Sequence, residues 1–251
     1  MILLAIDTSA IASAALLRWH DGDAEAALLA QFATEDTKSH AEVLAPGIRA
    51  LLDEQGLTGA HVDRIVVGVG PGPFTGLRSG IATARALAFA WDVPLGGLMS
   101  LDAVAWDVVA SGSSVQTIRG PRSTPASGET DARPLAAPSS DFLVATDARR
   151  REVYWGRYTA SGALLDGPHV AYPDALPPLP AYGAGAGIYG EKLAAAGAVV
   201  VPGFERAQPT AASLGLAAVE RLARGQALLD TAPRYLRESD AQVPGPRKKA
   251  L

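Results

Sequence analysis

Two aspartates follow apolar strands at corresponding places in the sequence, and their carboxylates are the first candidates for a functional site in this chain. Asp7 comes after the apolar run 2–6, and Asp147 comes after the run 142–145. Each polar turn is followed by a second strand, a glycine-containing turn and a third strand. The order indicates a weak internal duplication.

Paired Asp-bearing turns in a duplicated β-β-β-α design resemble the actin-like superfamily, which includes sugar kinases and the Hsp70 chaperones. In that superfamily the paired hairpins clamp the phosphates of ATP, and backbone amides approach the phosphates closely because the turns contain glycine. Here Asp7 is followed by Thr8 and Ser9, and Asp147 by 148–150, so neither turn contains glycine. We interpret the pair as a decayed nucleotide clamp.

Other catalytic and metal-binding patterns are missing. The absence of cysteine excludes disulfides, thiolate metal sites and thiol nucleophiles, and no Gly-x-Ser-x-Gly elbow of a serine hydrolase occurs. We expect no bound metal, since the four histidines lack ligand spacing: His20, His40, His61 and His169. The glycine loop 181–187, with Gly183 and Gly185, remains a weak candidate for holding an adenine or ribose.

The composition of the chain limits its partners. Of 251 residues, 48% are hydrophobic and the net charge is −4, which indicates a globular protein. A protein that grips RNA alone is normally basic, so we expect RNA contact only through a partner. The apolar start lacks a basic leader, and no apolar run approaches the roughly 20 residues that span a bilayer. We expect a cytoplasmic protein with no membrane contact.

The stretch 66–91 organises the rest of the chain. It predicts a buried strand, a turn with two Gly-Pro steps and an Ala-rich helix that ends near Trp91. One stripe of this helix is apolar at a three-four spacing: Phe74, Leu77, Ile81, Ala84, Ala88 and Trp91. A second stripe, Gly76, Gly80 and Ala84, has almost no side chain. Such a helix is either deeply buried or faces two partners, and both interpretations stay open.

Residues 1–110 predict a subdomain in the order β-β-β-α-β-α-β-α. The helix that starts at His40 contains Pro46, which we expect to bend it; the alternative is a helix that starts at Pro46 itself. We expect Ser100 to cap the last helix. The remaining elements are strands at 2–6, 12–19, 26–33 (with helix as an alternative) and 93–97, and helices at 40–55 and 101–110.

Residues 142–237 predict a second, reduced subdomain. It follows a low-complexity flexible insertion, 111–140, and precedes a disordered tail, 238–251. Whether the helix 211–224 packs back on the first subdomain stays open. The predicted elements are strands at 142–145, 152–159, 163–170 and 199–202, a Pro-rich linker at 173–180, helices at 188–196 and 211–224, and an extended piece at 234–237.

Four motifs occur in the order in which they occur in the bacterial TsaB (YeaZ) family, and together they resemble it over residues 1–110 and 142–237. The second motif is specific, whereas the others are individually weak. They are Ile6-Asp7-Thr8-Ser9; Gly70-Pro71-Gly72-Pro73-Phe74-Thr75-Gly76-Leu77-Arg78; Asp147-Ala148-Arg149 with Glu152-Val153-Tyr154; and Pro233-Arg234-Tyr235-Leu236-Arg237. The insertion departs from the compact family pattern.

The resemblance implies an α/β fold with two duplicated actin-like (RNase H-like) β-β-β-α-β-α subdomains, the second reduced. It implies a non-catalytic scaffold subunit without cofactor. Such a subunit dimerises with a TsaD-type catalytic paralogue and supports docking of a TsaE-type ATPase. The complex transfers threonylcarbamoyl to the adenosine next to the tRNA anticodon, and the tRNA would reach this chain only through the complex.

The resemblance also implies where the partner binds. In the family, two helices, here 39–55 and 75–91, pack against the equivalent pair of TsaD as a four-helix interface. Without TsaD we expect this surface to form a symmetric homodimer. The candidate interface residues are His40, Val43, Leu44, Gly47, Ile48, Leu51, Phe74, Leu77, Arg78, Ile81, Ala84, Arg85 and Ala88.

Two alternatives stay open. An active ATP-dependent kinase or transferase of the same superfamily would use Asp7 and Asp147. A peptidase-like regulator of TsaD would need a nucleophile or metal cluster, and the sequence shows neither.

Overall fold

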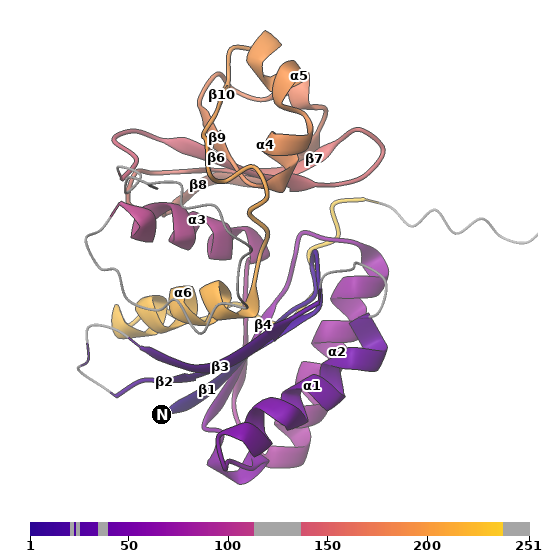
Figure 1. Ribbon diagram of the computed structural model, residues 1–251, viewed down its shortest axis with the longest axis vertical. Helices are drawn as coiled ribbons and strands as arrows, with labels where there is room; N and C mark the ends of the chain where they lie inside the picture. Colours follow the sequence, from indigo (N-terminus) through magenta and orange to yellow (C-terminus); the bar gives the residue numbers. More distant parts are fainter. Residues whose placement is uncertain (21–22, 24–25, 35–39, 113–136, 238–251) are drawn as a thin grey trace, which may run out of the picture.

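The fold is built from two five-stranded mixed sheets that lie one above the other (Figure 1). The computed structural model describes residues 1–20, 23, 26–34, 40–112 and 137–237. Most of the predicted insertion 111–140 and the whole predicted tail 238–251 therefore lie outside the described residues. Among the described residues, no helix is long and apolar enough to cross a membrane.

The first sheet has the strand order β3-β2-β1-β4-β5. Its central strand β1 is antiparallel to β2 and parallel to β4. Leu3 to Ile6 of β1 are all fully buried, because helices cover both faces of this sheet. The segment for which helix was an alternative, 26–33, is a strand. The bounds are β1 Ile2–Asp7, β2 Ser13–Arg18, β3 Ala27–Ala33, β4 Arg64–Gly68 and β5 Leu95–Leu98.

Helices α1 (His40–Glu54) and α2 (Phe74–Trp91) cover one face of the first sheet (Figure 1). Pro46 lies inside α1, so the helix begins before the proline, as predicted. The predicted cap of this helix, Ser39, lies outside the described residues. A short 3-10 turn, η1 (Gly59–His61), leads into β4.

Helix α6 (Ala211–Ala223), from the end of the chain, covers the other face of the first sheet. Its Leu214 and Ala218 are fully buried against Leu3, Leu17 and other side chains of β1 and β2. This contact answers the question that the sequence left open, since the helix does pack back on the first sheet.

The second sheet has the order β10-β9-β6-β7-β8. Counted from its other edge, β8-β7-β6-β9-β10, it repeats the order of the first sheet, with β6 in the place of β1. As in the first sheet, the central strand is antiparallel to one neighbour and parallel to the other. The predicted α/β fold with two duplicated subdomains is therefore confirmed. The bounds are β6 Phe142–Asp147, β7 Val153–Tyr158, β8 Leu164–Ala171, β9 Pro180–Tyr182 and β10 Val199–Val200.

Helix α3 (Ser100–Ser111) lies between the two sheets and packs on the second one through Leu101, Val104 and Val108. Two carboxyl groups tie it to its surroundings. Asp102 accepts a hydrogen bond from the Tyr158 hydroxyl at 2.9 Å, and Asp107 accepts one from the Ser213 hydroxyl of α6 at 2.8 Å.

The second subdomain is reduced where the first has helices. The counterpart of α1 is a single 3-10 turn, η2 (Pro173–Ala175), and the counterpart of α2 is the pair α4 (Ala184–Ile188) and α5 (Gly190–Ala195). The prediction of a linker and a glycine loop over residues 173–187 is thus wrong in part, because this stretch contains η2, β9 and most of α4. The predicted helix 188–196 is present as α5, which begins two residues later at Gly190, whereas α4 was not predicted.

Candidate functional site

The carboxyl group of Asp7 is fully buried and accepts hydrogen bonds from its own chain. Oδ1 accepts from the Ser9 amide at 2.8 Å and from the Ser9 hydroxyl at 2.6 Å, and Oδ2 accepts from the Ser100 hydroxyl at 2.7 Å. Ser100 Oγ in turn accepts from the Gly70 amide at 3.2 Å. The prediction that Ser100 caps α3 is therefore wrong, because the cap position is Met99. The Ser100 hydroxyl donates its hydrogen bond to Asp7 instead.

The glycines of the 68–80 stretch make room for this turn. A Cβ atom at Gly68 would lie 1.8 Å from Asp7 Oδ2, and one at Gly72 would lie 2.8 Å from Ser9 Cα. On α2, a Cβ at Gly80 would lie 2.2 Å from Thr8 Oγ1, and that hydroxyl donates to the Gly76 carbonyl at 2.8 Å. The predicted small-residue stripe thus packs against the chain's own first turn.

The second Asp turn is open to solvent and differs in chemistry. Asp147 Oδ1 accepts from the Arg149 amide at 2.9 Å and from the Tyr189 hydroxyl at 3.3 Å, and Oδ2 lies 3.5 Å from the Arg149 guanidinium. Residues 149–151, all arginine, have exposed side chains and positive φ angles of 62°, 52° and 65°. Tyr154 is buried on β7.

The last motif, 233–237, contacts both the second and the third motif. The Arg237 guanidinium donates to the Ala148 carbonyl at 2.8 Å and forms an ion pair with Glu152. Arg234 donates its backbone amide to the Val69 carbonyl, next to the Gly-Pro turn. The motif residues 70–72, 147–152 and 233–237 therefore meet at one side of the molecule, as parts of one packed arrangement.

The same C-terminal segment lies along α2. Arg78 donates to the Tyr235 hydroxyl at 3.1 Å, and its guanidinium carbon lies 3.5 Å above the centre of the Phe74 ring. Arg85 donates to the hydroxyl and carbonyl of Thr231. Both predicted interface arginines are exposed, yet each is oriented by its own chain.

The glycine loop proposed for adenine or ribose is filled by β6. Gly183 has a φ of 104°, and a Cβ there would lie 2.4 Å from the Ala145 carbonyl oxygen. A Cβ at Gly185 would lie 2.7 Å from the Thr146 carbonyl carbon. Both glycines let α4 approach the strand closely. Their packing accounts for the pattern without a ligand.

Most of the predicted interface residues are core residues. The side chains with less than 10% exposure all belong to one cluster with the first sheet: Leu44, Ile48, Leu51, Leu77, Ile81, Ala84 and Ala88. Val43 and Gly47 are half-buried, Phe74 is exposed, and the side chain of His40 lies outside the described residues. The motif residue Thr75, which was not among the predicted interface residues, is also exposed. The apolar stripe faces the chain's own sheet, so a partner cannot reach these seven side chains.

The exposed face of α2 is a different row, which the sequence reading missed. Ala82, Ala86, Phe89 and Ala90 are exposed, and Phe89 is 91% exposed. We call these four residues the α2 face. These four residues are apolar, and the exposed Arg85 lies one turn from both Ala82 and Phe89 on the same helix. The off-stripe Phe89 is the signal in the sequence that could have identified it.

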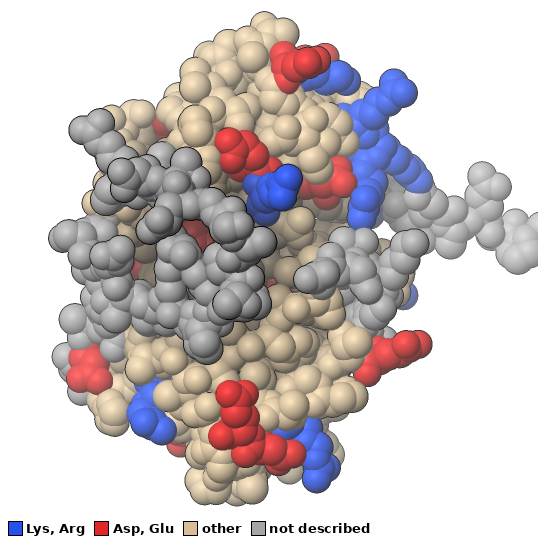
Figure 2. All heavy atoms as spheres, in the orientation of Figure 1, with Lys and Arg blue, Asp and Glu red and all other residues tan. Residues whose placement is uncertain are grey.

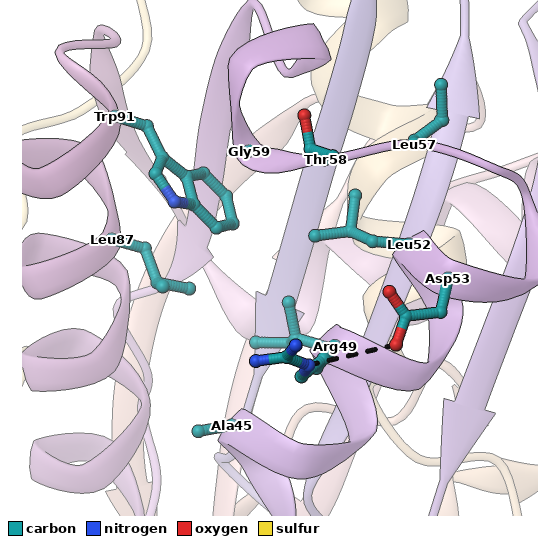
Figure 3. A pocket seen from close by; sticks show the side chains of 10 residues that line it. Ala45, Arg49, Leu52, Asp53, Leu57, Thr58, Gly59, Leu87 and Trp91 are labelled. Atoms are coloured by element: carbon teal, nitrogen blue, oxygen red, sulfur yellow. Dashed lines mark ion pairs between the residues drawn. The ribbon is translucent and has the colours of Figure 1, made fainter.

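A groove lies beside the α2 face, between α1 and α2 (Figure 3). It has a volume of about 300 Å³. Leu87 and Trp91 line it from α2, and Leu52 lines it from α1. The Arg49–Asp53 ion pair, at 3.8 Å, lies on its α1 side. Apolar surface therefore continues from the α2 face toward α1.

Comparisons with known proteins identify relatives of this chain. A family model described as "TsaD: tRNA N6-adenosine threonylcarbamoyltransferase" matches residues 28–121. An uncharacterised protein of Mycobacterium tuberculosis is 36% identical over 96% of this chain and 93% of its own length. The Bacillus subtilis tRNA threonylcarbamoyladenosine biosynthesis protein TsaB is 30% identical over 66% of this chain and 58% of its own length.

Solved structures extend the comparison over nearly the whole chain. A crystal structure from Pseudomonas aeruginosa, described as an uncharacterised protein with similarity to peptidase YeaZ, is 30% identical with a TM-score of 0.65. It covers 94% of this chain and 99% of that one. YeaZ from the same organism is 28% identical, with the same TM-score, over 92% of this chain and 97% of that one. The chain belongs to the TsaB (YeaZ) family.

Proposed function

We propose that this chain is a non-catalytic subunit of the complex that makes threonylcarbamoyladenosine in tRNA. It holds a TsaD-type catalytic paralogue on the α2 face and supports docking of a TsaE-type ATPase on the pair. The TsaB relatives imply a role in this tRNA modification. The non-catalytic role, the binding of the paralogue and the docking of the ATPase are our proposals. The observation that carries them is the exposed apolar α2 face, with the Phe89 ring 91% exposed.

The buried turn at Asp7 supports the non-catalytic part of the proposal. A carboxyl group that holds the metal of ATP must reach the nucleotide, whereas the Asp7 side chain is 0% exposed and bonded to Ser9 and Ser100. An active kinase or transferase that uses Asp7 would have to break these contacts first. The geometry favours a structural role.

The α2 face supports the scaffold part. Contiguous exposed apolar surface on a soluble protein commonly marks an interaction site. The alanines of this face let another helix approach closely, and Phe89 is an aromatic anchor of the kind found in interface hot spots. The groove at Leu87 and Trp91 extends the apolar surface toward α1. The packing partner that this geometry suits is a helix pair.

The replacement Ala86→Glu tests the proposal. A glutamate there would be buried in the interface without a partner charge, so we expect co-purified TsaD-type paralogue to fall at least about tenfold, a loss of about 1.4 kcal/mol or more. The matched control is Ala194→Glu on α5, which is also an exposed helical alanine. Both variants should unfold at the wild-type denaturant concentration. If Ala86→Glu co-purifies as much of the TsaD-type paralogue as the wild type does, the proposal is refuted.

The same face predicts the state of the isolated chain. Without a paralogue, a second copy covers the α2 face and gives a symmetric dimer. Light scattering should show a dimer for the wild type and a monomer for Phe89→Ser, which removes the exposed aromatic ring. A strictly monomeric wild type at high concentration would contradict this expectation, and so would a dimer that Phe89→Ser leaves intact.

A further inference from the structure

The exposed positions of α2 carry charge of one sign only. They are Phe74, Thr75, Arg78, Ala82, Arg85, Ala86, Phe89 and Ala90. The exposed arginine of the neighbouring helix α1 differs, because Arg49 lies 3.8 Å from Asp53. On the face that Figure 2 presents, acidic and basic side chains also lie close to one another. Helix α2 therefore presents two positive charges and no carboxylate of its own.

Uncharged groups of the C-terminal segment, residues 229–235, hold both arginines. Arg78 donates from Nε to the Tyr235 hydroxyl at 3.1 Å. Arg85 donates from Nε to the Thr231 hydroxyl at 3.1 Å and from Nη2 to the Thr231 carbonyl at 2.9 Å. Among the described residues, neither guanidinium has a carboxylate partner. The two groups are thus oriented without being neutralised.

The C-terminal segment is itself fixed to the first sheet at two points. Leu229 exchanges two backbone hydrogen bonds with Gly97 of β5, at 2.8 and 2.9 Å. Arg234 donates its backbone amide to the Val69 carbonyl at 2.7 Å, and Thr231 lies between the two attachments. A guanidinium that is oriented before binding loses less conformational entropy when it meets a carboxylate. The segment therefore prepares the arginines of α2 for a partner.

Both arginines lie in one row with the α2 face. Arg78, Ala82, Arg85 and Phe89 follow one another at spacings of four, three and four residues, which places them on one side of an α-helix. A helix that packs on the α2 face therefore also covers Arg85 and approaches Arg78. Covering a guanidinium without a partner charge is costly, so a tightly bound partner has to supply an acidic group there.

We propose that the partner of the α2 face carries carboxylates opposite Arg78 and Arg85, and that these arginines select it over a second copy of this chain. The inference rests on the proposed function, since it takes the paralogue as the occupant. Carboxylates match a guanidinium with paired hydrogen bonds. In a symmetric contact centred on the α2 face, by contrast, each Arg85 lies near the two-fold axis and so near its own copy. Complementary charge favours the first pairing, and like charge disfavours the second.

The test follows the heterodimer with the purified TsaD-type paralogue and the homodimer separately across a salt series. Calorimetry measures the first Kd and sedimentation the second. Salt should weaken the heterodimer, because it screens opposite charges, and strengthen the homodimer, because it screens like charges. Arg78→Gln with Arg85→Gln should weaken the heterodimer roughly tenfold at low salt, remove most of its salt dependence and tighten the homodimer roughly threefold.

Two further variants complete the test. Arg206→Gln with Arg224→Gln removes two exposed arginines elsewhere and should leave both Kd values within about twofold of the wild type. Tyr235→Phe keeps the ring and both charges but removes the hydroxyl that orients Arg78. It should weaken the heterodimer about threefold with an unchanged salt dependence, and it should add nothing once Arg78 is glutamine. An equal loss in both backgrounds would show that Tyr235 does not act through Arg78.

The outcomes distinguish this inference from the proposed function. If the double variant of α2 keeps the affinity and salt dependence of the wild type while Ala86→Glu loses the paralogue, the acidic partner surface is wrong and the proposed function stands. If salt weakens the homodimer as much as the heterodimer, the selection against a second copy is wrong. If Ala86→Glu keeps the paralogue, the proposed function fails instead, whatever the arginine variants do.

Discussion

The variant Asp7→Ala is expected to lose roughly 3–5 kcal/mol of unfolding free energy, because it leaves up to three buried donors without an acceptor. These donors are the Ser9 amide, the Ser9 hydroxyl and the Ser100 hydroxyl. The carboxyl group joins the end of β1 to the start of α3, so its loss loosens the centre of the first subdomain. Denaturant unfolding followed by circular dichroism measures the effect.

Two controls separate a structural from a catalytic aspartate. Ser9→Ala removes one of the donors together with its hydrogen bond and should cost only about 1 kcal/mol. Calorimetry of the wild type with Mg-ATP should show no micromolar binding. If Asp7→Ala folds as stably as the wild type while it abolishes Mg-ATP binding or hydrolysis, then the chain is an active enzyme of the superfamily and our proposal is wrong.

The strands and the duplication could be predicted because their signals are local. The apolar runs before Asp7 and Asp147 are each long enough for a buried strand, and each is followed by a turn and a second strand. The two copies of the sequence pattern fold into two sheets with the same strand order. The helix at His40 was also predictable, since its apolar spacing continues through Pro46.

The identity of the neighbours could not be predicted, because periodicity tells which residues are apolar and not what covers them. The stripe with Leu77 and Ile81 faces the chain's own sheet. Gly80 is small because Thr8, more than 70 positions earlier, occupies its space. Contacts between distant parts of the chain decide both cases, and a single sequence does not record them.

The second subdomain was predicted less well for a related reason. Its helices α4 and α5 are too short for a clear three-four period, and Gly183 and Gly185 suggested a loop. The structure uses these glycines for close contact with β6 instead. The sequence predicted only a turn at 149–151. The positive φ angles of its three arginines could not be predicted, since a positive φ at a non-glycine residue has no sequence signal.

The variant Asp107→Asn is expected to be more stable than the wild type at pH 8 and no more stable at pH 4. Burial raises the pKa of Asp107 from 3.8 to about 7, and the hydrogen bond from Ser213 offsets only part of that rise. The folded protein therefore keeps a proton that the unfolded chain has released. This contribution to stability is full below pH 4 and is lost as the pH rises through about 7.

The size of the effect follows from the shift. About 1.4 kcal/mol per pKa unit over roughly three units gives an upper figure of roughly 4 kcal/mol between pH 4 and pH 8. Unfolding by denaturant at several pH values measures it as the difference between variant and wild type. Asp102→Asn should show the same sign with the change complete near pH 6, since the pKa of Asp102 is raised to about 6 by burial, against the hydrogen bond from Tyr158 and the charge of Arg221.

A surface control completes the design, because Asp53→Asn on α1 removes one exposed carboxylate and reports the general effect of losing a negative charge. If Asp107→Asn follows Asp53→Asn at every pH, then Asp107 is not held in an environment that favours its proton. If Asp107→Asn is more stable than the wild type at pH 8 and no more stable at pH 4, then Asp107 is a destabilising acid at the contact between α3 and α6. The burial of this acid lowers stability at neutral pH, whereas its hydrogen bond with Ser213 fixes how the two helices pair. That pairing sets the distance between the sheet that carries the α2 face and the sheet that carries the arginine turn.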